Sequence, residues 1–397
     1  MRNNRRPAKS ILPGRYVQNH IPRATHRQGV RRLVYNKATR NQDAAVMKQT
    51  KTCKVCHIPL RVGKDHLWGP DGTITLRGIH DRRMVFFDSD GLDVLFSNIE
   101  SLLGISVEKI LIESKARSAR EYARRMLRGP KGQLARLVGL NRVVGRVLLQ
   151  GRILGYGRAG VSGFSWREGY ISVEIEDPYS LPLFCADFRG AAESVTRDPG
   201  TVTSEELGPG RYRVDVARGS SSPEFAGRLL PQPRARKPGD VTYNYCPRCG
   251  VPLEVSRFIW DLDRGTITHA DSGLRMALFG PQGLEVFFNE LEGELGDTIP
   301  ETVIEAQRMY AESRMSLRSI GASAGDVRSW LAIRGLGNLV SLDITEELLE
   351  ARIENPSLPL VIVGTSLSFY EFTFNRKGRM EWSLADDGDL RMRISPA

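Results

Sequence analysis

The sequence predicts an α+β fold in which one module occurs twice, each copy having helices packed against an antiparallel sheet. Three observations predict this fold. The motif C-x-x-C-x-x-P-L occurs as Cys53–Leu60 and again as Cys246–Leu253. Further residues match in the same order behind each motif, which is typical of an internal duplication. The same succession of a β-hairpin, helices and strands is predicted behind both motifs.

The matching residues keep a nearly constant spacing through most of each copy and shift by small gaps near the end. The matches pair Trp68 with Trp260, Gly72–Thr75 with Gly265–Thr268, Arg83–Met84 with Arg275–Met276, Gly91–Leu92 with Gly283–Leu284, Gly155–Gly157 with Gly335–Gly337, and Leu181–Leu183 with Leu358–Leu360. The copies therefore span residues 47–218 and 241–397. The segment 219–240 between them is rich in Pro, Ser and Gly and is predicted to be a linker.

Each predicted module begins with the cysteine knuckle and continues through elements of the same kind. A turn signal precedes each hairpin, and the first helix of each copy stops at a glycine, a common helix end. The first copy has a predicted hairpin at 73–87, helices at 91–104, 106–127 and 133–150, and strands at 170–178, 181–188 and 211–217. The second copy has a predicted hairpin at 266–279, helices at 283–296, 299–318 and 326–334, and strands at 350–356, 358–363, 369–374 and 390–395. The helices at 106–127 and 299–318 are the longer ones, and those at 133–150 and 326–334 are amphipathic.

The two knuckles predict a metal site. Two cysteines separated by two residues can turn both sulfur atoms toward one ion, and thiolate is a favoured ligand of zinc. Neither copy has a second cysteine pair, so packing about a pseudo-twofold axis would gather Cys53, Cys56, Cys246 and Cys249 into one zinc site. The alternatives are two separate sites, or reduced cysteines without a metal. Histidine ligation is less favoured because no histidine recurs at a matched position.

Other motifs are interpreted as structural. Gly155–Gly160 fits G-x-G-x-x-G, but a dinucleotide site needs a strand before it and a helix after it, whereas a helix precedes it here. A redox C-x-x-C is disfavoured because both motifs lead into Pro-Leu and a hairpin. Cys185 is predicted to be a small buried hydrophobe. The recurring carboxylates Glu176, Glu354, Glu193 and Glu371 are predicted to cap or to form ion pairs rather than to catalyse, so no enzymatic activity is assigned.

Positive charge is concentrated at the N-terminus. The chain of 397 residues has a net charge of +11, and residues 1–51 hold thirteen Lys and Arg against one acid. Residues 1–46 are therefore predicted to be a basic, disordered tail. Three interpretations stay open: a nucleic-acid or membrane-surface arm, an Arg-rich targeting peptide, or translation that starts at Met47. The nucleic-acid interpretation uses Arg5, Arg6, Arg31 and Arg32 of the tail and Arg124 and Arg125 of a basic helix face.

The module ends read EDPYSLPLFCADFRGAAESV (176–195) and ENPSLPLVIVGTSLSFYEFTF (354–374), and a helix begins near LGDTIPETVIEAQR (295–308). These stretches resemble the 4-vinyl reductase domain family. The resemblance implies small-molecule-binding α/β modules that hold hydrocarbon-like ligands or act as sensor and accessory modules. The family's usual cysteines near its end are missing from both copies, so no site residue is carried over. The knuckle and hairpin would then be an addition in front of each module.

Together these patterns predict a zinc-stabilised tandem-repeat protein that binds a hydrophobic small molecule or a protein partner through an apolar pocket between helices and sheet. The alternative is a nucleic-acid-binding protein that uses the basic tail and a zinc-knuckle core. The sequence has no apolar run near the length of a membrane span and no secretory core at its N-terminus, so a cytoplasmic location is predicted.

Overall fold

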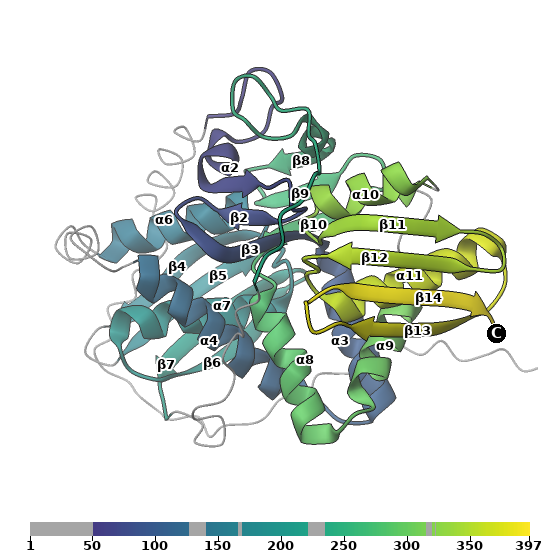
Figure 1. Cartoon of the computed structure of the whole chain (residues 1–397). Coiled ribbons are helices and arrows are strands. Elements are labelled where there is room, and N and C mark those ends of the chain that lie inside the picture. The colour runs from purple at the N-terminus through teal and green to yellow at the C-terminus, as the bar shows by residue number, and fades with distance from the viewer. Residues whose placement is uncertain (1–50, 127–139, 166–168, 221–234, 315–319, 322) are drawn as a thin grey trace, which may run out of the picture. The chain divides into compact units, whose positions relative to one another are not determined.

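Figure 1 shows the computed structural model of the chain, which describes residues 51–126, 140–165, 169–220, 235–314, 320–321 and 323–397. All of these residues belong to one compact unit, residues 32–397. The predicted tail with Arg5, Arg6, Arg31 and Arg32, most of the predicted linker, and residues 133–139 of a predicted helix lie outside the described residues. We call residues 51–220 the first half and residues 235–397 the second half.

The elements of the two halves follow the same order along the chain. The first half contains α2 (Leu60–Asp65), β1 (His66–Trp68), β2 (Ile74–Leu76), β3 (Ile79–Asp88), α3 (Ser89–Leu103), α4 (Glu108–Met126), α6 (Leu140–Ile153), β4 (Arg158–Ser165), β5 (Tyr170–Glu176), α7 (Leu181–Thr196), β6 (Gly200–Gly208) and β7 (Arg211–Arg218).

The second half differs in starting with a short 3-10 helix where the first half has α2. It contains η2 (Leu253–Arg257), β8 (Phe258–Asp261), β9 (Thr266–His269), β10 (Arg275–Phe279), α8 (Gln282–Leu295), α9 (Ile299–Arg314), α10 (Ala324–Ile333), β11 (Asn338–Ile344), β12 (Leu349–Glu354), α11 (Pro359–Phe374), β13 (Gly378–Leu384) and β14 (Leu390–Pro396). The predicted hairpins and the predicted helix ends at Gly104 and Gly296 are confirmed.

Three antiparallel sheets organise these elements. A six-stranded sheet has the order β1-β2-β3-β10-β9-β8, and the two hairpins join in it where β3 pairs with β10. The two four-stranded sheets have the orders β4-β5-β7-β6 and β11-β12-β14-β13, so they share one topology. In Figure 1, α11 lies against the sheet β11–β14. The structure is thus a mixed fold of helices and antiparallel sheets, as the sequence predicted.

The strands predicted at 181–188, 358–363 and 369–374 are wrong, because these residues form the helices α7 and α11. Each helix has a proline in its first turn, where the missing N–H costs nothing. Helix α11 packs against α9 on one side and against β13 and β14 on the other. Its side chains are therefore apolar nearly all round, and such a run has no helical period that would distinguish it from a buried strand.

Contacts between the halves are reciprocal. The indole N–H of Trp68 in β1 donates a hydrogen bond of 3.1 Å to the carbonyl oxygen of Ile333 at the end of α10. Trp260 in β8 donates one of 2.8 Å to the carbonyl oxygen of Ile153 at the end of α6. The tryptophan of each half is therefore hydrogen-bonded to the end of a helix in the other half.

The backbone repeats this exchange at matched positions. The backbone N–H of Phe86 in β3 donates a hydrogen bond of 2.9 Å to the carbonyl oxygen of Arg334, which follows α10. The N–H of Leu278 in β10 donates one of the same length to the carbonyl oxygen of Leu154, which follows α6. Two glycine contacts are matched as well, with Gly337 donating to Gly72 at 3.2 Å and Gly157 to Gly265 at 2.9 Å. The hairpin of each half thus packs on the part of the other half that carries the four-stranded sheet.

Two arginines reinforce the exchange. Arg83 of β3 donates to the carbonyl oxygens of Asn355 and Pro356 in the second half, at 3.0 and 3.1 Å. Arg275 of β10 donates to the carbonyl oxygens of Asp177 and Pro178 in the first half, the latter at 3.2 Å. The recurrence of this arginine in the sequence therefore has a structural reason.

None of the helices in the described part of the chain combines the length and the apolar character that a bilayer-spanning segment requires.

Candidate metal centre and apolar pocket

Each C-x-x-C motif forms a closed turn. The backbone N–H of Cys53 donates to the carbonyl oxygen of Ile58 at 2.8 Å, that of His57 donates to Cys53 at 2.9 Å, and the second motif repeats both bonds at the same lengths. His57 and Gly250 occupy matched positions with φ angles of 60° and 69°, a backbone conformation that favours glycine. His57 is exposed and serves the turn.

The sulfur atoms of Cys53, Cys56, Cys246 and Cys249 all lie within 4.8 Å of one another. Across the two knuckles, Cys53 Sγ is 3.7 Å from Cys246 Sγ, and Cys56 Sγ is 3.4 Å from Cys249 Sγ. A tetrahedral thiolate site with metal–sulfur bonds of about 2.3 Å requires sulfur–sulfur separations of roughly 4 Å. The four cysteines therefore form one cluster that could bind a metal ion.

The turns favour thiolate at two of the four sulfurs. Burial opposes ionisation of Cys53, but the N–H groups of Cys56 and Val55 donate to its sulfur and lower its pKa to about 6. At Cys246 burial is likewise outweighed by N–H groups, those of Cys249 and Arg248, and the pKa is lowered. Burial raises the pKa of the other two thiols, Cys56 and Cys249. A bound cation would remove this penalty, since it compensates thiolate charge.

Apolar side chains enclose the cluster. Cys53 and Cys246 are buried, with 0% and 2% of their surface exposed. The cysteines belong to a buried core that includes Ile58, Val62, Trp68, Val251, Val255 and Phe258. Such a dry shell limits access of water to a thiolate site and strengthens its electrostatics. The fifth cysteine, Cys185, is buried in α7, and burial raises its pKa to about 12, in agreement with the predicted inert hydrophobe.

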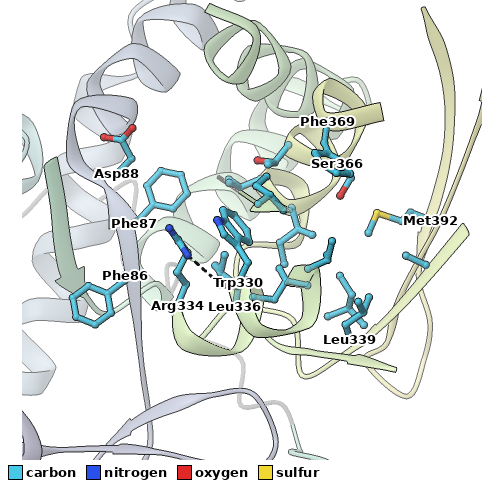
Figure 2. Close-up of a pocket in the computed structure, with 18 of the residues that line it drawn as sticks. Phe86, Phe87, Asp88, Trp330, Arg334, Leu336, Leu339, Ser366, Phe369 and Met392 are labelled. Carbon is cyan, nitrogen blue, oxygen red and sulfur yellow. Dashed lines mark hydrogen bonds between the residues drawn. The ribbon is translucent and has the colours of Figure 1, made fainter. Parts of the chain in front are cut away.

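A second feature is an apolar cavity of about 60 Å³ in the second half. It lies between α10, α11 and the sheet β11–β14, as Figure 2 shows. Its walls are aliphatic for the most part and include Leu339, Leu349, Ile353, Val361, Ile362 and Met392. Strand β3 of the first half contributes Phe86, Phe87 and Asp88 to one end. An apolar pocket between helices and sheet was expected for each module, and the second half has one.

The polar residues at this end were missed by the sequence analysis. Asp88 caps α3, because its side chain accepts hydrogen bonds from the backbone N–H groups of Asp90 and Gly91. Arg334 follows α10 without any motif. Burial raises the pKa of Asp88 to about 7 and lowers that of Arg334 to about 9. No local signal could have brought these two residues together, because they are far apart in the sequence.

The buried charge of Asp88 gives a testable pH dependence. The carboxyl has a raised pKa in the folded state, so its ionisation disfavours folding above pH 7, and the penalty vanishes as pH falls toward about 4. Asn caps helices as well as Asp does. We therefore expect Asp88→Asn to raise the free energy of unfolding by roughly 2 kcal/mol at pH 8 and to leave it unchanged near pH 4. Urea titrations at both pH values measure this, and an equal effect at both would contradict it.

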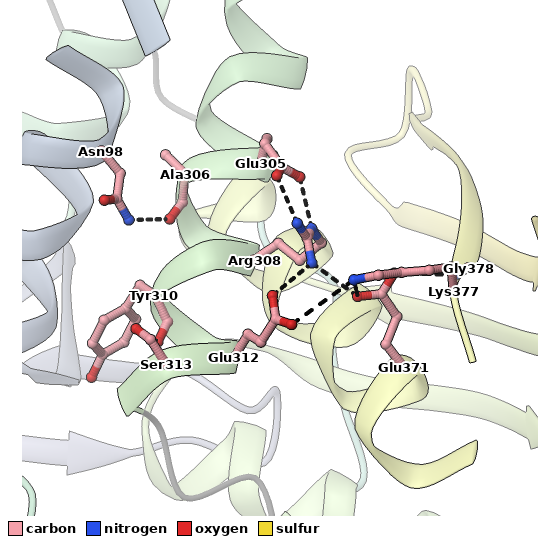
Figure 3. Close-up of polar contacts among 10 residues, drawn as sticks. All are labelled: Asn98, Glu305, Ala306, Arg308, Tyr310, Glu312, Ser313, Glu371, Lys377 and Gly378. Atoms are coloured by element: carbon pink, nitrogen blue, oxygen red, sulfur yellow. Dashed lines mark hydrogen bonds and ion pairs between the residues drawn. The ribbon is translucent and has the colours of Figure 1, made fainter. Parts of the chain in front are cut away.

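Glu193 and Glu371 recur for a structural reason. Each accepts a hydrogen bond from the first N–H of the following strand, Gly200 at 3.0 Å and Gly378 at 3.2 Å. Each also pairs with an arginine: Arg189 of α7 lies 2.9 Å from Glu193, and Arg308 of α9 lies 3.0 Å from Glu371. Figure 3 shows the second of these networks, in which Arg308 also pairs with Glu305 and Glu312.

The remaining recurring carboxylates also form ion pairs. Glu176 lies 3.6 Å from Arg158, and Glu354 lies 3.1 Å from Arg352. On the predicted basic helix face, Arg125 is paired with Asp81 at 2.7 Å and with Glu121 at 2.6 Å, whereas Arg124 is exposed. The charge of Arg125 is therefore compensated.

The glycines of Gly155–Gly160 serve close packing between a helix and a strand, as interpreted from the sequence. Helix α6 precedes them and β4 follows. Gly155 and Gly157 have φ angles of 84° and 100°. A Cβ on Gly157 would lie 2.3 Å from the carbonyl oxygen of Asp177, so only glycine fits there.

No protein-family profile matches the chain, and no curated protein matches it. Solved structures with some likeness are H-NOX proteins. One is an oxygen-binding H-NOX domain related to soluble guanylate cyclases, 15% identical over 34% of this chain and 79% of that chain, with a TM-score of 0.22. Another is a mutant of T. tengcongensis H-NOX, 16% identical over 34% of this chain and 81% of that chain, also with a TM-score of 0.22. At such TM-scores these likenesses carry no argument about fold or function.

Proposed function

We propose that this chain is a zinc-stabilised, duplicated small-molecule-binding protein. The observation that carries the zinc part is the convergence of four cysteine sulfurs from two distant turns. Zinc favours a tetrahedron of four thiolates in structural sites, and thiolate is too soft a ligand for magnesium or calcium. Because two ligands come from each half, the ion would hold the halves together at the knuckles.

Metal analysis of the purified full-length chain under reducing conditions tests the zinc site. We expect about one equivalent of zinc per chain, because the four sulfurs form a single cluster. Two equivalents would indicate separate sites. Less than half an equivalent would overturn the proposal, and iron in place of zinc would overturn the identity of the metal.

The duplication is supported by matched structure. The two four-stranded sheets have one topology, and the contacts of Trp68 and Trp260 with the opposite half are equivalent. In this proposal the halves are copies of one module, residues 47–218 and 241–397, and the chain makes internally the contacts that a symmetric dimer would make between two subunits.

The small-molecule part is supported by the apolar cavity. A concave, mostly apolar site with a few polar groups is the usual form of a ligand pocket. The cavity is lined by α11, and this helix lies within residues 354–374, one of the stretches that resemble the 4-vinyl reductase family. Binding of a hydrophobic small molecule, in a sensor or accessory role, is the function that this arrangement supports best.

Nucleic-acid binding is the second candidate, and the charge of residues 1–51 favours it. It predicts affinity for DNA or RNA that falls steeply with salt and that weakens when residues 1–46 are removed. Filter binding of the full and shortened chains at two salt concentrations decides this. An affinity that truncation leaves unchanged would show that the tail is not responsible.

A further inference from the structure

The cavity of the second half has a polar end and an apolar end. In Figure 2, Arg334, Trp330 and Asp88 lie toward one side, whereas Leu339 and Met392 lie toward the other. Three polar atoms at or near the polar end find no hydrogen-bond partner among the described residues: Asp88 Oδ2, Trp330 Nε1 and Tyr310 Oη. Asp88 and Tyr310 are buried, with 5% and 1% of their surface exposed. Buried polar atoms of this kind carry a desolvation cost unless something binds them.

The guanidinium of Arg334 is the central group of the polar end. Only 7% of this residue is exposed. The guanidinium donates to the carbonyl oxygen of Trp330 at 3.4 Å and stacks on the Trp330 ring at 4.4 Å. Among the described residues, no carboxylate forms an ion pair with it, and Asp88 is the acidic group that attracts it from a longer distance. A guanidinium has five N–H donors, and a buried one without a paired anion is costly.

The fold itself does not require this charge. In the matched contact of the other half, the carbonyl oxygen of Leu154 accepts from Leu278 as that of Arg334 accepts from Phe86, both at 2.9 Å. The backbone role of the position is therefore performed equally well by leucine. The arginine side chain lines the cavity and has no counterpart at the matched Leu154, which points to a ligand rather than to folding.

We propose that this cavity binds a small monocarboxylate, with the carboxylate on Arg334 and Trp330 Nε1 and the hydrocarbon part toward Leu339 and Met392. The inference rests on the proposed small-molecule function and names the class of ligand. A carboxylate matches the fork of guanidinium donors and accepts a further bond from the indole N–H. Burial raises the pKa of Asp88 to about 7, so about half of its carboxyl groups are protonated at neutral pH and do not repel the anion.

The size of the cavity limits the hydrocarbon part. Its volume of about 60 Å³ is less than half of the roughly 150 Å³ that admits a benzene molecule in an engineered protein cavity. We therefore expect short aliphatic acids to bind best. Longer acids would have to displace side chains at the apolar end, where Leu339 and Met392 are buried.

Isothermal titration calorimetry with the full-length chain tests the proposal. The probes are butanoate, hexanoate and octanoate, each compared with the 1-alcohol of the same length. We expect each carboxylate that binds to do so at least about tenfold more tightly than its alcohol, as one charge-assisted pair predicts. The variant Arg334→Leu reproduces the leucine of the matched position and should fold. It is expected to lose this preference and to bind acid and alcohol alike.

Two further variants complete the test. Arg328→Leu removes the same charge from α10, where Arg328 pairs with Asp240 outside the cavity, and should leave the preference intact. Trp330→Phe keeps a ring but lacks the N–H, and should weaken acid binding alone. Equal binding of acids and alcohols to the unaltered chain would overturn the carboxylate assignment and leave an apolar pocket. Absence of all binding would overturn the small-molecule function as well, while zinc content is judged separately.

Discussion

Because the proposed zinc site uses all four cysteines, replacement of Cys246 by serine is expected to lower the thermal midpoint of unfolding by roughly 10 °C. Loss of one ligand would release the proposed metal, and loss of a structural metal belongs to the few changes that cost more than about 4 kcal/mol. At about 2–4 °C per kcal/mol for a large domain, this gives the expected shift. Differential scanning calorimetry of the full chain in reducing buffer measures it.

The matched control is Cys185→Ala. Cys185 is also buried but lies in α7, outside the cluster. Its truncation removes one sulfur from the core and should cost only about 1–2 kcal/mol. A strong zinc chelator should lower the midpoint of the unaltered chain and leave that of Cys246→Ser unchanged. Equal midpoints for the two cysteine variants would contradict a metal that stabilises the fold.

Gly72→Ala and Gly265→Ala are each expected to lower the free energy of unfolding by roughly 3–5 kcal/mol. Both glycines have positive φ angles, 73° and 70°. A Cβ on Gly72 would lie 2.3 Å from the carbonyl oxygen of Gly337, and one on Gly265 would lie 2.4 Å from that of Gly157. The backbone itself would have to separate, since no flexible side chain can give way.

The chain provides controls for the strain alone. Gly78 and Gly273 also have positive φ angles, 80° and 68°, but nothing lies within 4 Å of a Cβ built on either. Alanine there should cost only the left-handed conformation, about 1–2 kcal/mol. Urea titrations give all four values. If the variants at Gly72 and Gly265 are no less stable than the controls, the close contact between the halves does not stabilise the protein.

Features that depend on residue type at fixed positions could be predicted from the sequence. The knuckles, the hairpins and the helix ends at Gly104 and Gly296 are of this kind. The sequence matches between the two copies place both knuckles at the start of equivalent segments. For this reason the four sulfurs are predicted to converge in one site. The short sulfur–sulfur distances show this convergence.

Features that depend on packing could not be predicted. Helix α11 has apolar residues on nearly all sides because it is covered on nearly all sides, and this removed the period that identifies a helix. Edge strand β6 has mostly polar residues and gives no clear alternation. Edge strand β13, by contrast, alternates Met380, Trp382 and Leu384 with polar residues, a signal that could have been found. The polar end of the cavity requires Asp88 and Arg334 from opposite halves, and only the three-dimensional arrangement brings them together.

The reciprocal contacts also set the order of events when the protein is made. Ile333, which accepts the hydrogen bond of Trp68, follows it by 265 residues. A ribosome that adds about 5–20 residues per second needs roughly 13–50 s to cover this distance. During that time Trp68 lacks this acceptor, and the part of the hairpin that packs on the second half stays accessible to chaperones or to other nascent chains. Completion of the first half is therefore a late event that waits for the last third of the chain.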